Sequence, residues 1–456
     1  MFVARFPMLT ISCCAVLFAV SSQNAAAATH CVNPGGAGGC YSKIQTAVNH
    51  ASPNDLINVA AGTYKEDVVI GIPLSLLGAG ASSTWINAAG LANGIFVDGY
   101  DHAGLNHVTV AGFTVENAQF EGILVVSASD VTIRDNHIND NDKFGPVFSP
   151  NPGGCAGQPA FETDETGDCG GALHMIGTYN SIASGNTMIG NADGILISDE
   201  TAEAHDNLII HNIVKNNPLD CGIVLASHAP VGATGPHFAP HHGIDHNTLS
   251  ENVSADNGVM VGGAGIGMFS DGNGPGRVSE NVVIHNTMTG NGIGGFSMHS
   301  HVGPAFGAPA DDMNGNMIIG NYIAGNLADG GDTATPGRVG ININSGGGGS
   351  PIWGTVISQN VIRDEDIDIA FNTPGAVNIH LNDLLGGHVG VGNVCAFDKA
   401  TICTGASNAT ENYWGCAGGP GRSGCSTVSG AHITSNPWLS KPAADDDDVQ
   451  QLGDED

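Results

Sequence analysis

Short apolar segments alternate with asparagine and glycine along most of the chain. Three segments between residues 186 and 301 align with one another: NTMIGNADGILISDE, NIVKNNPLDCGIVLASH and NTMTGNGIGGFSMHSH, which begin at Asn186, Asn212 and Asn286. In each, a second asparagine follows the first by five residues, and a glycine-containing turn leads into an alternating apolar strand. A repeat of this kind predicts short strands stacked coil upon coil in a solenoid.

The repeat continues as columns of equivalent residues. The first asparagine column is predicted to contain Asn136, Asn186, Asn212, Asn247, Asn286, Asn321 and Asn360, and the second Asn141, Asn191, Asn217, Asn252, Asn291 and Asn326. The glycine before each apolar strand gives a third column: Gly94, Gly122, Gly170, Gly194, Gly222, Gly265, Gly295 and Gly340. Asparagine tolerates left-handed backbone, and stacked amides can bond to one another, so the columns predict a tight turn repeated in every coil.

The strand after each glycine is predicted to have one inward and one outward side. Residues one and three places past the glycine should point inward, and those two and four places past it outward. The segment GALHM fits only if it shifts by one residue, which places Leu173 and Met175 inside and His174 outside. The repeats thus predict an all-β fold, a single parallel solenoid over roughly 55–392 with about eleven coils spaced about 4.8 Å apart.

One amphipathic helix is predicted over residues 42–51 (SKIQTAVNHA), with Ser42 as its N-cap. This helix, the strand after it and the segment AAGTYKEDVVI resemble the entry of right-handed parallel β-helix proteins of the pectin-lyase-like superfamily. The resemblance implies a single-stranded right-handed parallel β-helix whose open N-terminal end is covered by the helix. The segment ENYWGCAGGPG resembles the terminal element of many secreted β-helix repeat proteins.

The chain order of these features predicts five parts. Residues 1–28 are expected to be a secretory signal peptide, because Arg5 precedes an apolar run and alanines follow at 25–28. An N-terminal cap over 29–54, the β-helix over 55–392, a cysteine-containing cap over 393–440 and an acidic disordered tail over 441–456 come next. The protein is therefore expected to be secreted, periplasmic or at the cell surface, with no transmembrane segment after signal removal.

Nine cysteines follow the signal, and eight of them form neighbouring couples. The couples are Cys31/Cys40, Cys155/Cys169, Cys395/Cys403 and Cys416/Cys425. In an exported chain this spacing predicts local disulfides. Cys221 is left over and directly precedes a strand, which predicts a buried free thiol.

The charge balance is strongly acidic, with 44 Asp and Glu against 12 Lys and Arg and a formal net charge of −32. An acidic excess of this size disfavours nucleic acid and anionic lipid surfaces as partners. It would also repel a polyuronate unless a divalent cation such as calcium intervened, although no Asp-rich calcium loop of fixed spacing is present.

Insertions in the repeat point to one face of the predicted solenoid. One set follows the second asparagine of the repeat, at 142–169, 253–264 and 327–339. The other set follows the end of the glycine strand, at 229–240, 272–276 and 302–310. Both sets flank the outward side of that strand. In the resembled superfamily the substrate groove commonly lies along such a face, which implies a polysaccharide or cell-surface glycan as the partner.

Titratable residues fall on this predicted face. Six residues past the glycine, four consecutive coils carry Glu200, His228, Asp271 and His301, and His299 lies four residues past it. We interpret these five as candidate catalytic residues, because imidazole and carboxylate suit proton transfer near neutral pH, and His174, Asn342, Asn344, His241 and His242 as candidate substrate-binding residues. The competing interpretation is that polar residues merely end strands where solvated turns begin. A further column of His211, His246 and His285 is interpreted as a structural surface ladder.

Three functional hypotheses remain open from the sequence. The first is a secreted polysaccharide lyase, epimerase or hydrolase; the second is a non-catalytic surface, adhesion or glycan-binding β-helix. The third is a periplasmic metal-handling β-helix, suggested by Met268, Met298 and the histidines. The NTD, DD, GHG and RIK segments of polygalacturonases and the DPH signature of mannuronan epimerases are missing, so the resemblance transfers no catalytic residue. Whether the protein is an enzyme is thus left open by the sequence.

Overall fold

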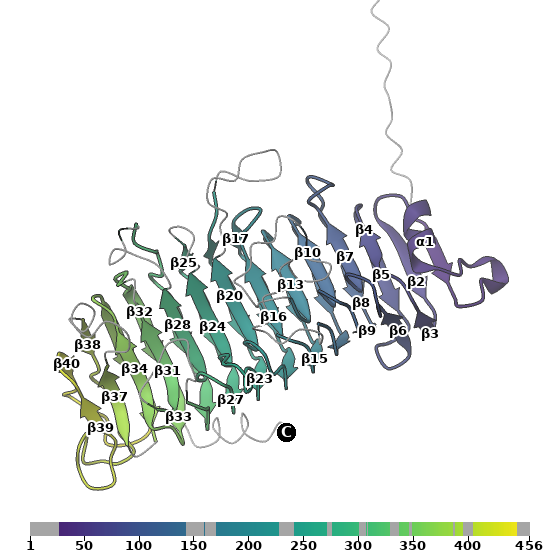
Figure 1. Cartoon of the computed structure of the whole chain (residues 1–456). Helices are drawn as coiled ribbons and strands as arrows, with labels where there is room; N and C mark the ends of the chain where they lie inside the picture. Colours follow the sequence, from purple (N-terminus) through teal and green to yellow (C-terminus); the bar gives the residue numbers. More distant parts are fainter. Residues whose placement is uncertain are drawn as a thin grey trace, which may run out of the picture.

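The computed structural model describes residues 27–142, 159, 170–227, 241–270, 276–300, 307, 309–328, 337–345, 349–385, 388–394 and 405–444. These residues form an elongated parallel β-helix, with helix α1 (Ile44–His50) at one end and the last short strands at the other (Figure 1). Every pairing between named strands is parallel, and successive coils pair in three long sheets. The predicted all-β parallel solenoid is therefore confirmed.

The three long sheets and one small sheet account for all the strands within the described residues. Sheet A contains β1 (Thr29–Val32), β2 (Asp55–Val59), β5 (Leu74–Gly78), β8 (Thr109–Ala111), β11 (Thr132–Arg134), β14 (Ile182–Ser184), β18 (Leu208–Ile210), β22 (Thr248–Ser250), β26 (Val282–Ile284), β29 (Met317–Ile319), β32 (Trp353–Ser358), β35 (Ala376–His380), β38 (Ala406–Asn408) and β40 (Ile433–Thr434). Sheet B contains β3 (Gly62–Tyr64), β6 (Thr84–Asn87), β9 (Thr114–Glu116), β12 (His137–Asn139), β15 (Thr187–Ile189), β19 (Ile213–Lys215), β23 (Val253–Ala255), β27 (Thr287–Thr289), β30 (Tyr322–Ala324), β33 (Val361–Arg363) and β36 (Asp383–Leu384). Sheet C contains β4 (Val68–Ile70), β7 (Ile95–Asp98), β10 (Ile123–Val126), β13 (Leu173–Ile176), β16 (Ile195–Ser198), β20 (Ile223–Ser227), β24 (Ile266–Ser270), β28 (Phe296–Ser300), β31 (Val339–Asn344), β34 (Ile367–Asn372), β37 (Val389–Asn393) and β39 (Thr427–Ser429). The small sheet D contains β17 (Ala204–His205), β21 (Ile244–Asp245) and β25 (Val278–Ser279).

The glycine strands of the sequence repeat form sheet C. Ile195 and Ile197, one and three places past Gly194, are fully buried in the solenoid core, as the alternation predicts. Leu173 pairs in register with Ile195, and Leu173 and Met175 lie in the core, as predicted. The predicted register was wrong, because Leu173 stands one place past the glycine position and not three, and His174 two places and not four. The residue in the glycine position of that coil is therefore Ala172, not Gly170. Side chains two and four places past the glycine make the outer face of sheet C.

Buried asparagines form ladders at three corners of the coils, where two columns were predicted. In each ladder the side-chain Oδ1 of one asparagine accepts hydrogen bonds from the backbone N–H and from Nδ2 of the asparagine one coil earlier, as between Asn212 and Asn252, at 3.0 Å for both. The first ladder runs Asn136, Asn186, Asn212, Asn252, Asn286, Asn321, Asn360, Asn382 and Asn412, the second Asn141, Asn191, Asn217, Asn257, Asn291 and Asn326, and the third Asn207, Asn247, Asn281 and Asn316. These bonds satisfy buried turn amides that no sheet partner could reach.

The predicted columns were wrong in one coil. Asn247 was assigned to the first column and Asn252 to the second, but the hydrogen bonds place them in the third and first ladders. This coil has asparagine at 247, 252 and 257, so a spacing of five residues fits two alignments equally well. The insertion predicted from residue 253 begins instead after Asn257, because 253–255 forms β23.

The histidine column changes with the ladders. A residue with left-handed backbone precedes each ladder asparagine in most coils, and His211, His246 and His285 all take this role, with φ of 56°, 56° and 57°. His211 and His285 belong to the first ladder, and Nε2 of His211 lies 2.7 Å from Oε2 of Glu251 in the next coil. His246 precedes Asn247 and so belongs to the third ladder. The predicted single column is therefore two separate ones.

Helix α1 packs against β1, β2 and β4 and covers the N-terminal end of the solenoid, as predicted. Ser42 does not cap it. The carboxylate of Glu66 accepts the backbone N–H groups of Ile44 and Gln45 at 2.9 Å each and so satisfies the free N–H groups of the first turn. A residue from the next coil thus supplies the cap that the local sequence was expected to provide.

Two of the four predicted disulfides lie within the described residues, Cys31–Cys40 and Cys416–Cys425. The second lies in the C-terminal cap beside the fully buried Trp414. Cys221 is buried and is not part of a disulfide, as predicted. Cys155, Cys169, Cys395 and Cys403 lie outside the described residues, as do residues 1–26 of the predicted signal. In the described part of the chain, no helix is both long and apolar enough to cross a bilayer.

Candidate functional site

The predicted site residues lie on the outer face of sheet C, in two rows. Outer row 1, two places past the glycine position, contains Phe96, Leu124, His174, Leu196, Val224, Gly267, Ser297, Asn342, Ala370 and Gly392. Outer row 2, four places past it, contains Asp98, Val126, Ile176, Ser198, Ala226, Phe269, His299, Asn344 and Asn372. Three of the candidate catalytic residues, His228, Asp271 and His301, lie outside the described residues.

A continuous hydrogen-bonded array joins three strands of this face. Nδ1 of His174 on β13 lies 3.1 Å from Oε1 of Glu121, and its Nε2 lies 2.7 Å from Oγ of Ser198 on β16. Ser198 in turn donates to Oε2 of Glu200 at 2.5 Å. The other carboxylate oxygen of Glu121 accepts the N–H of Gly171 at 2.8 Å. We call Glu121, His174, Ser198 and Glu200 the His174 cluster; all four side chains are buried.

The hydrogen bonds of the His174 cluster place one proton on Nε2 of His174 and a second between His174 and Glu121. Since Ser198 donates its only proton to Glu200, its oxygen must accept from Nε2–H of His174. Nδ1 of His174 then faces Glu121, and one proton lies between these two atoms. On the imidazole, this proton makes His174 a cation that contacts the carboxylate of Glu121 on one side and the hydroxyl of Ser198 on the other. The array can therefore hold and move a proton over three side chains.

A second carboxyl group beside the cluster is held protonated. Burial, and secondarily the negative charge of Glu121, raise the pKa of Asp142 to about 8. Asp142 thus carries its proton at neutral pH while its neighbours accept hydrogen bonds. Gly171 is required here because a Cβ atom would overlap the carboxylate of Asp193 on the adjacent coil. Carboxyl groups in different protonation states at one site are what general acid and base catalysis needs.

Replacing Asp142 by asparagine is expected to stabilise the protein increasingly as pH rises. The folded-state pKa of about 8 lies above the ordinary value of 3.8, so the native state holds the proton more tightly than the unfolded chain. The contribution to stability is complete below about pH 4 and is lost as pH rises through about 8. Thermal unfolding of wild type and Asp142→Asn between pH 4 and pH 9 measures the difference. Parallel curves for the two proteins would contradict the raised pKa of Asp142.

A second polar group lies farther along the same face. The rings of His299 and Phe269 in outer row 2 are 4.3 Å apart between centroids, and Asn342 and Asn344 lie on the next strand, β31. Four strand spacings separate His299 on β28 from His174 on β13, or about 19 Å. The structure therefore brings His174 and Glu200 together, and His299 together with the asparagines, but does not place all of them at one centre.

The two remaining predicted residues, His241 and His242, border the face without joining either group. Nδ1 of His242 lies 2.6 Å from the backbone oxygen of Asp199, and His241 is exposed. The carboxylate of Asp199 accepts a hydrogen bond from Ser227 of the next coil at 2.9 Å. Among the residues that the structure describes, no three His, Cys, Asp or Glu side chains converge as metal ligands.

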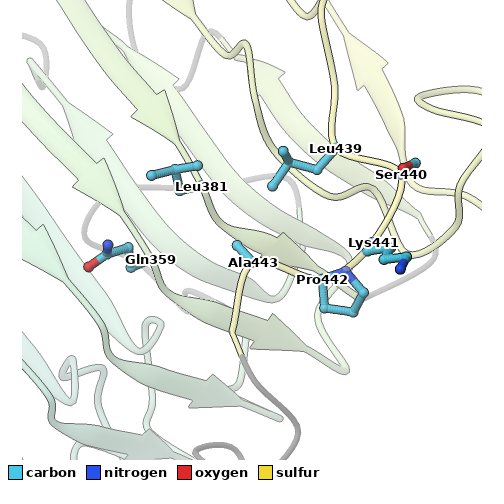
Figure 2. A pocket seen from close by; sticks show the side chains of 7 residues that line it. All are labelled: Gln359, Leu381, Leu439, Ser440, Lys441, Pro442 and Ala443. Carbon is cyan, nitrogen blue, oxygen red and sulfur yellow. The ribbon is translucent and has the colours of Figure 1, made fainter.

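A cavity of about 350 Å³ lies away from sheet C, near the C-terminal end (Figure 2). Its walls are Gln359, Leu381, Leu439, Ser440, Lys441, Pro442 and Ala443. It is a gap between two coil corners and the C-terminal segment, which is anchored where the carboxylate of Asp383 accepts the N–H groups of Ala443 and Ala444. It contains no acid–base pair, so we place the candidate site at the His174 cluster.

Sequence reasoning missed Glu121, Asp142, Asp193 and Ser198. Ser198 lies four places past Gly194 and could have been found by the same outward rule that selected His299. Glu121 and Asp193 each directly precede a glycine-column residue, so an acidic residue before the glycine was the available signal. Asp142 carried no comparable pattern, since its protonation depends on burial.

Comparisons with known proteins agree with this architecture. Residues 84–239 match the family model described as right handed beta helix region. The catalytic domain of a GH87 α-1,3-glucanase solved with nigerose superposes with a TM-score of 0.57 at 13% identity, covering 86% of this chain and 66% of that domain. The chain thus spans about two thirds of the length of the glucanase domain.

Two further solved structures are similar to the chain. One is the A-module of a mannuronan C-5 epimerase from Azotobacter vinelandii, with 13% identity, a TM-score of 0.47, and coverage of 88% of this chain and 94% of that module. The other is an alginate lyase from Paenibacillus sp. str. FPU-7, with 14% identity, a TM-score of 0.40, and coverage of 89% and 99%. No curated protein matches the chain by sequence. Together with the stacked parallel sheets, the family-model match over residues 84–239 and the superposition on the glucanase domain show that the fold is a right-handed parallel β-helix.

Proposed function

We propose that this protein acts on an extracellular polysaccharide at the outer face of sheet C, with His174 as the proton-transfer residue. The observation that carries the proposal is the unbroken hydrogen-bonded array from Glu121 through His174 and Ser198 to Glu200. Buried arrays of imidazole and carboxylate groups are the usual means by which proteins shift a proton at neutral pH.

The array supplies the elements of glycosidic or uronate chemistry. Breaking a sugar chain requires a proton for the leaving oxygen or removal of a proton from a ring carbon. His174 can give or take that proton, while Glu121 orients its ring and stabilises the imidazolium. Asp142, whose pKa is about 8, is a further candidate for the acid. The fold likeness to an α-1,3-glucanase solved with nigerose supports a polysaccharide as the substrate class.

Export is part of the proposal. The disulfides Cys31–Cys40 and Cys416–Cys425 suit a protein that folds in an oxidising compartment. A large acidic excess also keeps a protein soluble and apart from anionic surfaces.

The second candidate function is glycan binding without catalysis, and the burial of the His174 cluster favours it. His174, Ser198 and Glu200 are each 0% exposed, as expected of a network that rigidifies the coils. A binding protein would use the same face, but turnover would not occur.

Incubating the purified full-length protein with polyuronates and neutral glycans is the direct test. We expect new reducing ends, a 4,5-unsaturated product, or a change in uronate stereochemistry on at least one substrate. New reducing ends alone indicate hydrolysis, new reducing ends together with a 4,5-unsaturated product indicate elimination, and a change in uronate stereochemistry indicates epimerisation. Binding on a glycan array with none of the three products would reject the enzyme in favour of the binding protein.

A further inference from the structure

Two neighbouring side chains on the outer face of sheet C are buried without hydrogen-bond partners. Ser297 and Asn342 are register partners on β28 and β31, and both are 0% exposed. Oγ of Ser297 and both Oδ1 and Nδ2 of Asn342 make no hydrogen bond. Native proteins leave few buried polar atoms without a hydrogen bond. Two such side chains next to each other therefore call for a single explanation.

The side chains that neighbour these two residues in outer row 1 are unusually small. In outer row 1, Gly267 precedes Ser297, and Ala370 and Gly392 follow Asn342. Earlier coils fill the same row with Leu124, His174, Leu196 and Val224. The hydroxyl and amide groups therefore stand on a part of the sheet where neighbouring side chains take up little space.

An aromatic surface borders the pair. A Cβ atom at Gly267 would lie 2.5 Å from the ring of Phe269, so this ring extends over the glycine next to Ser297. The ring of His299 lies against Phe269 in outer row 2. Ligand sites commonly combine an aromatic wall with a few polar groups that fix orientation.

The charges on this face disfavour an anionic ligand. Within the described residues, neither outer row contains lysine or arginine. The whole chain carries a formal net charge of −32. A uronate carboxylate would meet no countercharge from the described residues of these two rows, whereas a neutral sugar hydroxyl can both donate to and accept from an amide.

We propose that Ser297 and Asn342 form a binding site for the hydroxyl groups of an uncharged glycan. The inference deepens the proposed function and rests on it for the location of the reacting centre. Five strand spacings separate Asn342 on β31 from His174 on β13, or about 24 Å. A glycan held at both places must extend along sheet C, so the substrate is a neutral polymer.

The test measures binding and stability of full-length Asn342→Leu and Ser297→Ala variants by calorimetry. The probes are uncharged tetrasaccharides of glucose, galactose and mannose, with tetramannuronate as the charged comparison. We expect wild type to prefer a neutral probe and each variant to bind it at least tenfold more weakly. Removing an unpaired buried polar group should also raise the thermal midpoint of the free protein, because the group is satisfied only by ligand.

Three results would overturn the site: equal affinity of variants and wild type, equal or tighter binding of tetramannuronate, or no binding of any neutral probe. A trapped water molecule on Asn342 would produce the first of these. His174→Gln separates this inference from the proposed function, since it should lower turnover by about 10²–10⁴-fold while the neutral tetrasaccharide probes still bind at Ser297 and Asn342. Retained affinity without any turnover in wild type would reject the reaction but support the site.

Discussion

Glutamine in place of His174 is expected to lower polysaccharide turnover by about 10²–10⁴-fold, the range that general acid–base catalysis contributes. Glutamine can still bond to Glu121 and Ser198, but it cannot carry a proton between them. The measurement is kcat on the substrate that the glycan panel identifies, together with the thermal midpoint of the variant. An unchanged midpoint with lost kcat would assign the loss to chemistry and not to folding.

Two companion variants make this result specific. His211→Gln changes an exposed histidine that pairs with Glu251 away from sheet C, and should leave turnover unchanged. Ser198→Ala removes the hydroxyl that joins His174 to Glu200. It should reduce turnover less than His174→Gln if the serine only positions the imidazole ring. If His174→Gln and His211→Gln were equally active, the His174 cluster would be a structural network and the reacting centre would lie elsewhere.

Local patterns predicted the architecture because each coil repeats the same physical problem. The apolar positions one and three places past the glycine must face the core in every coil, so Ile195 and Leu173 could be placed without a structure. Where several alignments satisfy the repeat pattern, the local sequence cannot decide which ladder a residue joins. Asn247 and Asn252 were both assigned to the wrong ladder, because only hydrogen bonds between coils distinguish the possible alignments. Glu66, which caps α1 from the next coil, was invisible for the same reason.

The sequence pattern and the structure select the same face for the candidate site, but not the same set of residues. His174 and Glu200 were both selected, yet with separate roles, and the serine that joins them was passed over. Residues at the same repeat position in successive coils look like one site in the sequence. In the solenoid they are spread along the axis and lie at several separate places. Each coil adds about 4.8 Å, so His299 in outer row 2 lies about 19 Å from His174 in outer row 1, although both belong to the outer face of sheet C. Catalytic groups must lie close together in space, which in this fold means within one or two coils.

The largest effect on stability is expected from Asn217→Ala in the second asparagine ladder. Oδ1 of Asn217 accepts the backbone N–H and the side-chain Nδ2 of Asn191 at 2.9 and 3.1 Å, and its own Nδ2 donates to Asn257 and to the backbone oxygen of Met188. Alanine leaves the two donors of Asn191 buried and unpaired. At about 1–3 kcal/mol for each such group, the free energy of unfolding should fall by about 3 kcal/mol or more.

The adjacent residue provides a matched control of the same type. Asn216 is exposed and has a left-handed backbone with φ of 57°, a conformation that glycine adopts without cost. Asn216→Gly should therefore change stability by no more than about 0.5 kcal/mol. Denaturant unfolding compares the two variants, and hydrogen exchange should locate the loss in the coils that contain Asn191 and Asn257. If both variants unfolded at the wild-type midpoint, the ladder bonds would contribute nothing beyond what water supplies, and the stability of the coils would have to come from the apolar core alone.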